Sequence, residues 1–321
     1  GGVVPEIASR KHIEVIAQLA DQALEQAGLS RGDIDAVAVT YAPGLIGAVL
    51  VGVSFAKSVA YALGVPLIPV HHVRGHIAAN YLAHPDLEPP FVCLCVSGGT
   101  SLLVDVKGYT EMEILGATRD DAAGECFDKI ARVMGLGYPG GAPLDRAAQG
   151  GNDKAFSLPR VHIQDAPLDM SFSGLKTAML NLIHNAQQKG EELPVADLAA
   201  SFSAAVSEEL VPRTMAAAQA KGYGKVAVVG GVAANSRIRR DLEQACQAAG
   251  CTLYLPPLKL CGDNGSMIGS QGYYEYLAGT RAGTDLNAYA NREISRPYGT
   301  GTAPVFPSPV EKSVESVHNS L

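Results

Sequence analysis

The sequence predicts an α/β protein with mixed sheets, and three observations support that prediction. Segments with strand character alternate with segments of helical period along most of the chain. One pair of strands is joined by the short sequence SGGT, which is typical of a hairpin. Glycine is frequent, at 35 of 321 residues, as expected for tight turns between strands and helices. The length exceeds one ordinary domain and fits two lobes of about 150 residues each.

The expected elements follow from apolar spacing and from glycine and proline positions. Helices are predicted over 6–28, 45–64, 71–83, 120–135, 174–188, 194–221, 235–249 and 264–279. Strands are predicted over 35–41, 65–70, 91–96, 101–106, 225–231 and 251–257. Residues 137–145 are expected to form a glycine- and proline-rich loop. Residues 296–321 have no periodicity and many Pro, Gly and Ser, so we predict a disordered tail.

Composition limits the classes of function. Hydrophobic residues make up 47% and charged residues 18%, so a large core can form. The net charge of −7 excludes nucleic-acid binding by bulk electrostatics, and such a role needs a local basic patch or a partner. Arg237, Arg239 and Arg240 on one predicted helix are candidates for that patch; the alternative is an ordinary solvated helix face.

The longest uncharged run, residues 36–56, has the length of a membrane span. The sequence Tyr41-Ala42-Pro43-Gly44 divides it, so we predict a strand and then a helix, and no membrane segment. The helix over 45–64 is apolar on all sides, which indicates that it is buried or covered by another protein. The six cysteines form no C-x-x-C pair, which predicts reduced thiols in a cytoplasmic protein.

The clearest chemical motif is HHVRGH at 71–76. His72 and His76 are four residues apart, so on a helix both imidazoles point the same way and can share one metal ion. The alternative is a surface helix with scattered histidines. The metalloprotease pattern HExxH fails because Val73 follows His72, and HxxEH fails at Gly75. Asp263 in CGDNG is the candidate third ligand; alternatively it is only the N-cap of the following helix.

Three glycine-rich turns are candidates for nucleotide binding. They are SGGT at 97–100, YPGG at 138–141 and GGVAAN at 230–235, the last between a strand and a helix. Exposed amides at such turns bind phosphate, although most glycine turns are only turns. No GxGxxG or P-loop sequence is present in the chain, which disfavours Rossmann and Walker sites.

Two polar stretches have both a structural and a functional interpretation. The acidic groups of DDAAGECFDK at 120–129 favour a helix N-terminus, and Asp128, further along, is placed to bind ribose hydroxyls. The sequence SFSGLKT at 171–177 is either a helix cap or a contact for an anionic substrate.

Taken together, these motifs resemble the tRNA threonylcarbamoyladenosine synthesis family of the bacterial TsaD type. The matching stretches run from residue 1 to about 270 and are GGVVPEIASRKH, PGLIGAVLVG, HHVRGH, VSGG, DDAAGECFDK, GYPGG, SFSGLKT, VGGVAAN and DNGSMI. The resemblance implies a two-lobed actin/sugar-kinase/Hsp70-like (ASKHA) fold with an incomplete N-terminal lobe. That lobe would be 1–70, completed by a C-terminal helix region 264–295, with 71–263 as the metal- and nucleotide-binding lobe and 296–321 as the tail.

The same resemblance implies an acyltransferase. Threonylcarbamoyl would pass from threonylcarbamoyl-AMP to the exocyclic amine of the adenosine 3′ of the anticodon, in tRNAs reading ANN codons, with release of AMP. The implied metal ligands are His72, His76 and Asp263, holding one divalent ion, with Fe²⁺ preferred and Zn²⁺ as the alternative. The implied substrate contacts are Cys95, Val96, Ser97, Gly98, Gly99, Asp128, Gly141, Asp145 and Asn235. The implied partners are tRNA, a TsaB-like paralogue and a TsaE-like ATPase.

The sequence departs from the family pattern at three places. Thr100-Ser101-Leu102 stands where the family has HTQ, and Gly262 replaces the Thr of CTDN. The family's opening hairpin, with a phosphate loop and a candidate catalytic Asp, does not precede Gly1, so no general base can be named. From this we expect the printed chain to bind metal without transferring the acyl group. Two rival functions remain open, a non-catalytic scaffold subunit of the modification complex and a metalloprotease.

Overall fold

The structure is a computed structural model and describes residues 4–161, 163–296 and 298. The strands are β1 Val37–Ala42, β2 Leu67–His71, β3 Phe91–Val96, β4 Ser101–Val106, β5 Met112–Ala117, β6 Lys225–Val229 and β7 Thr252–Tyr254. The helices are α1 Pro5–Ala27, α2 Ile46–Leu63, α3 His72–Ala83, α4 Ala123–Val133, α5 Gly141–Ala147, α6 Ser173–Lys189, α7 Val195–Lys221, α8 Ser236–Ala249, α9 Leu258–Cys261 and α10 Gly265–Leu277. Two 3-10 turns, η1 Arg31–Asp33 and η2 Gly231–Ala234, complete the elements. The α/β prediction is therefore confirmed.

The chain folds as two compact units. The larger unit contains 72–274 and a short segment that begins at 293. Of the described residues, the smaller unit contains 4–71, 275–292 and Tyr298. The helix α10 thus begins in the larger unit and ends in the smaller one.

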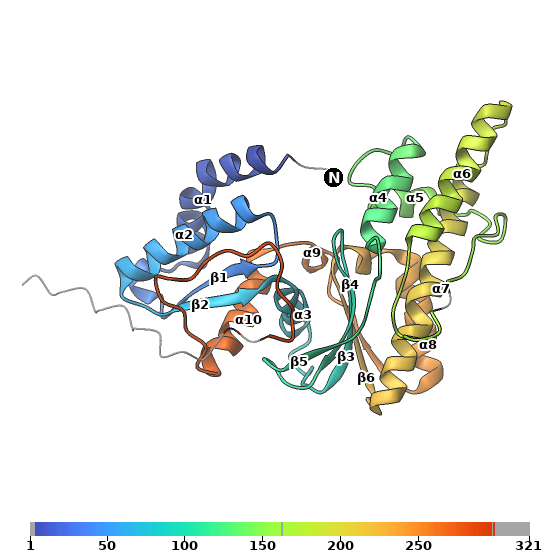
Figure 1. Cartoon of the computed structure of the whole chain (residues 1–321). Helices are drawn as coiled ribbons and strands as arrows, with labels where there is room; N and C mark the ends of the chain where they lie inside the picture. Colours follow the sequence, from blue (N-terminus) through green and yellow to red (C-terminus); the bar gives the residue numbers. More distant parts are fainter. Residues whose placement is uncertain (1–3, 162, 297, 299–321) are drawn as a thin grey trace, which may run out of the picture. The chain divides into compact units, whose positions relative to one another are not determined.

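The larger unit is built on a five-stranded mixed sheet in the order β5-β4-β3-β6-β7 (Figure 1). The strand β3 pairs antiparallel with β4, as the predicted hairpin requires, and parallel with β6. Side chains of β3 alternate between two cores. Val92, Leu94 and Val96 pack with apolar residues of α4, α6, α7 and α8. Cys93 and Cys95 pack with residues of α3 on the other face.

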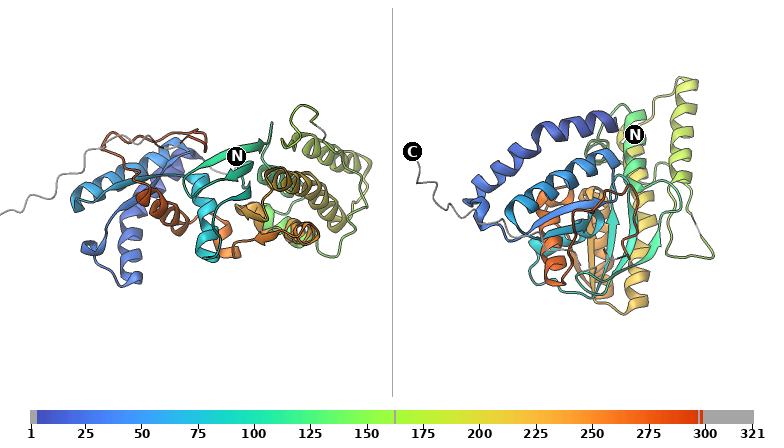
Figure 2. Two further views of the ribbon diagram at one scale, coloured as in Figure 1. Left: turned by 90° about the horizontal axis from the view of Figure 1, so that it is seen from below. Right: turned by 60° about the vertical axis from the view of Figure 1, so that its left-hand side comes forward.

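The smaller unit contains the parallel strand pair β1–β2 and the helices α1 and α2 (Figure 2). The predicted division of the run 36–56 into strand and helix is confirmed, because β1 ends at Ala42 and α2 begins at Ile46. Among the described residues, α2 is the one helix whose length and apolar composition match a membrane span. It belongs to the fold, since Val53 and Ala56 are buried in the core with β1.

Three sequence predictions need correction. The strand β5 was not predicted; it is a sheet edge, and its adjacent apolar residues Ile114 (exposed) and Leu115 (half-buried) interrupt the alternating pattern. The predicted loop over 137–145 contains the start of α5, because Pro143 lies in the first helical turn, where no backbone donor is needed. The predicted C-terminal helix region 264–295 is helical only to Leu277, and Gly279 with φ +82° follows. The predicted tail lies outside the described residues, apart from Arg296 and Tyr298.

Candidate functional site

The two histidines and the aspartate predicted as metal ligands lie together in the larger unit. His72 begins α3 directly after β2, and His76 follows one turn later with a ring-centroid separation of 4.7 Å. Asp263 lies in the loop between α9 and α10. Its Oδ1 is 3.5 Å from His72 Nε2 and 3.0 Å from His76 Nε2. One ligand atom from each residue therefore falls within 4.8 Å of the others.

The protonation of this triad suits a divalent cation. Burial lowers the pKa of His72, which keeps its imidazole neutral. The contact with His76 lowers the pKa of Asp263 and so favours the carboxylate. His76 is buried, and neither of its ring nitrogens makes a hydrogen bond of good geometry to another described residue. Such an orphaned imidazole next to a carboxylate has the donor set of a metal site.

The alternative role for Asp263, as the N-cap of α10, is wrong. The cap is its neighbour Asn264, whose Oδ1 accepts a hydrogen bond from the backbone N–H of Met267 at 2.9 Å. The Asn264 side chain also donates to the carbonyl of Gly262. The Asp263 carboxylate is thus not needed by the helix and remains available as a ligand.

Two of the three predicted glycine turns, at 97–100 and 230–235, lie side by side at the carboxyl edge of the central sheet. The strands β3 and β6 are parallel neighbours, so the SGGT turn after β3 lies beside the turn that follows β6. A Cβ added to Gly230, at φ +94°, would lie 2.2 Å from the carbonyl oxygen of Val96. Gly98 and Gly99 are exposed, and no atom would lie within 4 Å of a Cβ on either. Their backbone is open to a ligand.

The side chains of the other predicted substrate residues are partly engaged within the protein. Cys95 and Val96 are buried in β3, which leaves only their backbone for a ligand. Asp128 accepts a hydrogen bond from the N–H of Gly140 at 2.6 Å and so fixes the loop before Gly141. Gly141 begins α5 with open space around it.

Asp145 and Asn235 come close together through Ser236. Asp145 Oδ1 accepts hydrogen bonds from the N–H and hydroxyl of Ser236, at 3.0 and 2.8 Å. Asn235 caps α8 through its Oδ1, and its Nδ2 is buried without a partner in the described structure. A pocket of about 150 Å³ borders Asp145 and Ser236 and is also lined by Ser203 and Arg237. One of the expected contacts, Asp145, thus lines a cavity, and Asn235 is the chain neighbour of Ser236, which also lines it.

The two polar stretches with open interpretations bind each other. Asp120 accepts hydrogen bonds from the backbone N–H of Phe172 at 2.8 Å and of Ser173 at 3.2 Å, at the start of α6. The Lys176 ammonium forms an ion pair with Asp121. Neither stretch caps its own helix with a side chain, since the N-cap residues Ala122 of α4 and Phe172 of α6 make no side-chain cap hydrogen bond. Asp120 instead accepts the free donors at the start of α6.

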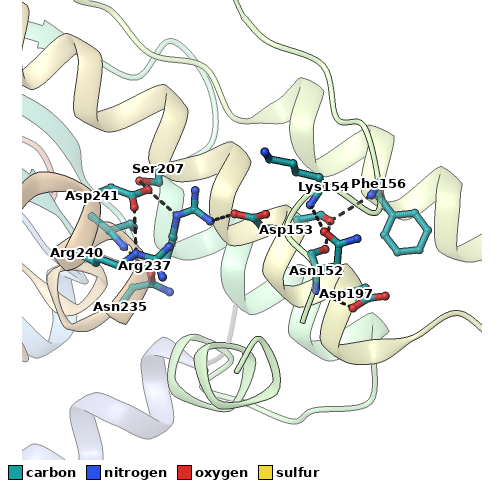
Figure 3. Close-up of polar contacts among 12 residues, drawn as sticks. Asn152, Asp153, Lys154, Phe156, Asp197, Ser207, Asn235, Arg237, Arg240 and Asp241 are labelled. Carbon is teal, nitrogen blue, oxygen red and sulfur yellow. Dashed lines mark hydrogen bonds and ion pairs between the residues drawn. The ribbon is translucent and has the colours of Figure 1, made fainter. Parts of the chain in front are cut away.

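The three arginines predicted for a basic patch do not share one face. Arg237 forms ion pairs with Asp153 and Asp241 (Figure 3). The guanidinium of Arg239 donates to backbone carbonyls inside the unit. Only Arg240 is exposed, so the patch as predicted is wrong.

Sequence reasoning missed one residue that shapes the site. Gly124, in the first turn of α4, packs directly on the SGGT turn, and a Cβ there would lie 2.4 Å from the carbonyl oxygen of Ser97. A glycine at the start of an otherwise helical segment was the available signal.

Comparisons with known proteins agree with the motifs. The family model for TsaD, tRNA N6-adenosine threonylcarbamoyltransferase, matches residues 1–270. A Clostridium botulinum strain 657 protein of that name is 52% identical over 294 residues, which cover 92% of this chain and 86% of the relative. A Moorella thermoacetica protein of the same name is 54% identical over 288 residues, which cover 90% of this chain and 84% of the relative.

A solved structure supports the fold. The crystal structure of full-length HypF in its phosphate- and nucleotide-bound form aligns with a TM-score of 0.60 at 16% identity. The alignment covers 80% of this chain and 41% of HypF. At this identity the likeness concerns the fold alone, which is of the ASKHA type.

Proposed function

Because this chain belongs to the TsaD family of tRNA N6-adenosine threonylcarbamoyltransferases, we propose specific roles for its residues in that transfer. The donor is threonylcarbamoyl-AMP, and the acceptor is the adenosine 3′ of the anticodon in tRNAs reading ANN codons. The exocyclic amine attacks the carbamoyl carbon, a new N–C bond forms and the C–O bond to the phosphate breaks. AMP leaves, and one proton is released in the net reaction.

The observation that carries the proposal is the convergence of His72, His76 and Asp263. Two imidazoles and one carboxylate are a donor set that suits Fe²⁺, and Zn²⁺ accepts the same ligands, so we propose one divalent ion with Fe²⁺ preferred. When bound, the ion supplies Lewis-acid polarisation and a template for the donor. The residues of the chain orient the two substrates around it.

The glycine turns hold the adenylate in this proposal. The exposed amides of Gly98 and Gly99 suit the phosphate, because backbone donors at such a turn are aimed at an anion. Asp145 lines a cavity together with Ser236, the residue after Asn235, and in this proposal Asp145 and Asn235 hold the nucleoside. Ser97, Asp128 and Gly141 shape the remaining walls, together with the backbone of Cys95 and Val96.

The partners follow from charge and from an apolar surface. At a net charge of −7 the chain needs help to hold tRNA, and we propose that a TsaB-like paralogue and a TsaE-like ATPase complete the complex. We define the α1–α2 apolar face as the exposed Ile7, Ile13, Leu19, Ile46 and Leu50. An apolar face of this kind fits the paralogue. The compartment we propose is the cytoplasm, where the buried thiols stay reduced.

Metal content tests the central part of the proposal. We expect elemental analysis of the anaerobically purified full-length protein to find one Fe or Zn per chain. The double variant His72→Ala/His76→Ala should lose the ion, because one carboxylate alone does not hold it. His12→Ala, an exposed histidine on α1, is the matched control and should keep the ion. A stoichiometric ion in the double variant would refute the triad, and chelator-sensitive peptide cleavage would favour the protease reading.

A further inference from the structure

Arg239 on α8 connects three separate segments of the larger unit. Its Nε donates to the carbonyl of Ala233 at 2.6 Å, within the turn at 230–235. Its Nη2 donates to the carbonyl of Pro256 at 2.7 Å and lies 3.4 Å from Cys261 Sγ at the end of α9. The planar guanidinium can make these contacts together because its donors point in fixed directions.

The last of these contacts bears on the third metal ligand. Asp263 follows Cys261 by two residues, and its side chain is 77% exposed, whereas that of His76 is 5% exposed. His72 and His76 are fixed by helix α3, so Asp263 is the least constrained of the three ligands. Its loop is held at both ends, by the buried Cys261 and by Asn264, which caps α10. Cys261 is anchored by its burial and by contacts of its thiol with the carbonyls of Pro256 and Pro257, and Arg239 adds a further contact to the same sulfur.

The contact of Arg239 with Ala233 involves the turn at 230–235, which we propose as part of the nucleotide site. Ala233 and Asn235 belong to one short turn that is closed by backbone hydrogen bonds, from Ala233 to Gly230 and from Asn235 to Val232. A displacement of this turn moves the carbonyl that Arg239 binds. The same guanidinium also binds the carbonyl of Pro256 and lies beside Cys261, so it links the turn to the segment before the metal ligand.

We propose that Arg239 is a positioning residue that ties the metal-ligand loop 262–264 to the turn at 230–235, so that nucleotide and metal each strengthen the binding of the other. The proposal rests on the proposed function, because it takes the turn as part of the adenylate site. Coupling between two binding sites is reciprocal, and typical couplings change affinity about five- to 150-fold. Arg239 therefore acts on affinity at both sites, through contacts that touch neither ligand.

The neighbouring arginines provide the contrast. Arg237 is held by Asp153 and Asp241, and Arg240 lies near Asp241 (Figure 3). In the described part of the chain, the ion pairs of both residues are with Asp153 and Asp241, which lie outside the metal-ligand loop. Arg240 is exposed on the same helix, so Arg240→Gln is the matched control for Arg239→Gln.

The test measures binding of two probes, Zn²⁺ and AMP, to the full-length protein. Zn²⁺ affinity is determined by competition with a chromophoric chelator, with and without saturating AMP, and AMP affinity by calorimetry, with and without Zn²⁺. We expect AMP to tighten Zn²⁺ binding about tenfold in the wild type, and Zn²⁺ to tighten AMP binding by the same factor. In Arg239→Gln, Zn²⁺ alone should bind about tenfold more weakly, and the coupling factor should fall to about one.

The variants and the wild type give separable outcomes. Arg239→Lys keeps the charge but cannot bridge three acceptors, so it should show reduced coupling, and it decides the question if Arg239→Gln does not fold. Arg240→Gln should match the wild type. A wild type that binds both probes without coupling, or unchanged coupling in the Arg239 variants, would overturn the role of Arg239 alone. A wild type that binds no AMP or no Zn²⁺ would overturn the proposed function itself.

Discussion

Replacing Gly124 by alanine should damage the substrate site while the fold survives. Gly124 lies in the first turn of α4, and its N–H donates to the carbonyl of Ser97 at 3.2 Å. An added Cβ would lie 2.4 Å from that oxygen and 2.7 Å from the Cα of Gly98. Both neighbours are backbone atoms, so no side-chain rotation can relieve the contact. The turn itself must move.

The magnitude follows from these distances. Ordinary contact with a Cβ begins at 3.4 Å, so the Ser97 carbonyl has to retreat by about 1 Å. A misplacement of about 1 Å at a catalytic site can cost about 100-fold in rate. Overpacking costs about 1–3 kcal/mol of stability, and alanine in place of glycine in a helix returns up to about 1 kcal/mol. We therefore expect kcat/KM to fall about 100-fold, with a loss of unfolding free energy of at most about 3 kcal/mol.

The assay is threonylcarbamoyl transfer to unmodified tRNA by the full-length protein and its partners, combined with AMP calorimetry and denaturant unfolding. Gly269→Ala is the matched control, because Gly269 is also helical and exposed, and an added Cβ meets nothing within 4 Å. That variant should keep full activity and AMP affinity. Wild-type kcat/KM and AMP affinity in folded Gly124→Ala would refute the reasoning, since the SGGT turn would then not be part of the site.

Further predictions concern stability and assembly. Asp120→Ala should lower the free energy of unfolding by about 1–2 kcal/mol at pH 7, because it removes the acceptor of two backbone donors at the start of α6; denaturant titration measures this. Burial raises the pKa of Asp120, but hydrogen bonds from Ser171, Phe172 and Ser173 outweigh it and lower the pKa below 3.8. The Asp120 carboxylate therefore contributes fully to the free energy of unfolding above pH 3.8, and this contribution is lost as the pH falls through the lowered pKa. If wild type and Asp120→Ala differed in unfolding free energy by the same amount at pH 7 and at pH 2, the assignment would be contradicted. Leu50→Arg should abolish co-elution with a TsaB-like partner, because it places a charge on the α1–α2 apolar face. The control Leu258→Arg, at an exposed leucine of the larger unit, should still co-elute. Co-elution of the Leu50→Arg protein would place the partner elsewhere.

Much of the fold could be predicted from hydrophobic periodicity and from the glycine and proline residues at turns. In the sequence FVCLCV-SGGT-SLLVDV, the short turn between the two strands determines their pairing register. The strands β3 and β4 accordingly form a hairpin in which Val96 pairs with Ser101. The metal triad was also accessible, because four-residue spacing on a helix fixes the relative placement of His72 and His76. Asp263 lies far from them in the chain, so the sequence CGDNG offers it only as a candidate ligand or helix cap, and the family resemblance favours the ligand.

The remaining details depend on tertiary contacts, which produce no periodic pattern in the amino-acid sequence. The strand β5 forms by antiparallel pairing with the edge of β4, and its own alternation of apolar and polar residues is weak. Asp263 and Asn264 are equally good helix caps by residue type, and only the geometry assigns the cap to Asn264. The sequence predicts an exposed cation at Arg239, because its acceptors at Ala233, Pro256 and Cys261 belong to other segments that meet it only in the folded chain.

One measurement tests the central claim most directly, namely that this transferase works through the triad of His72, His76 and Asp263. It is the mass-spectrometric content of threonylcarbamoyladenosine in unmodified tRNA after incubation with threonylcarbamoyl-AMP, the partner proteins and the full-length enzyme. We predict stoichiometric modification by the wild type and by the His12→Ala control. Asp263→Ala should leave the adenosine unmodified, although it folds. Undiminished modification by Asp263→Ala, or none by a wild type that binds both Zn²⁺ and AMP, would contradict the account.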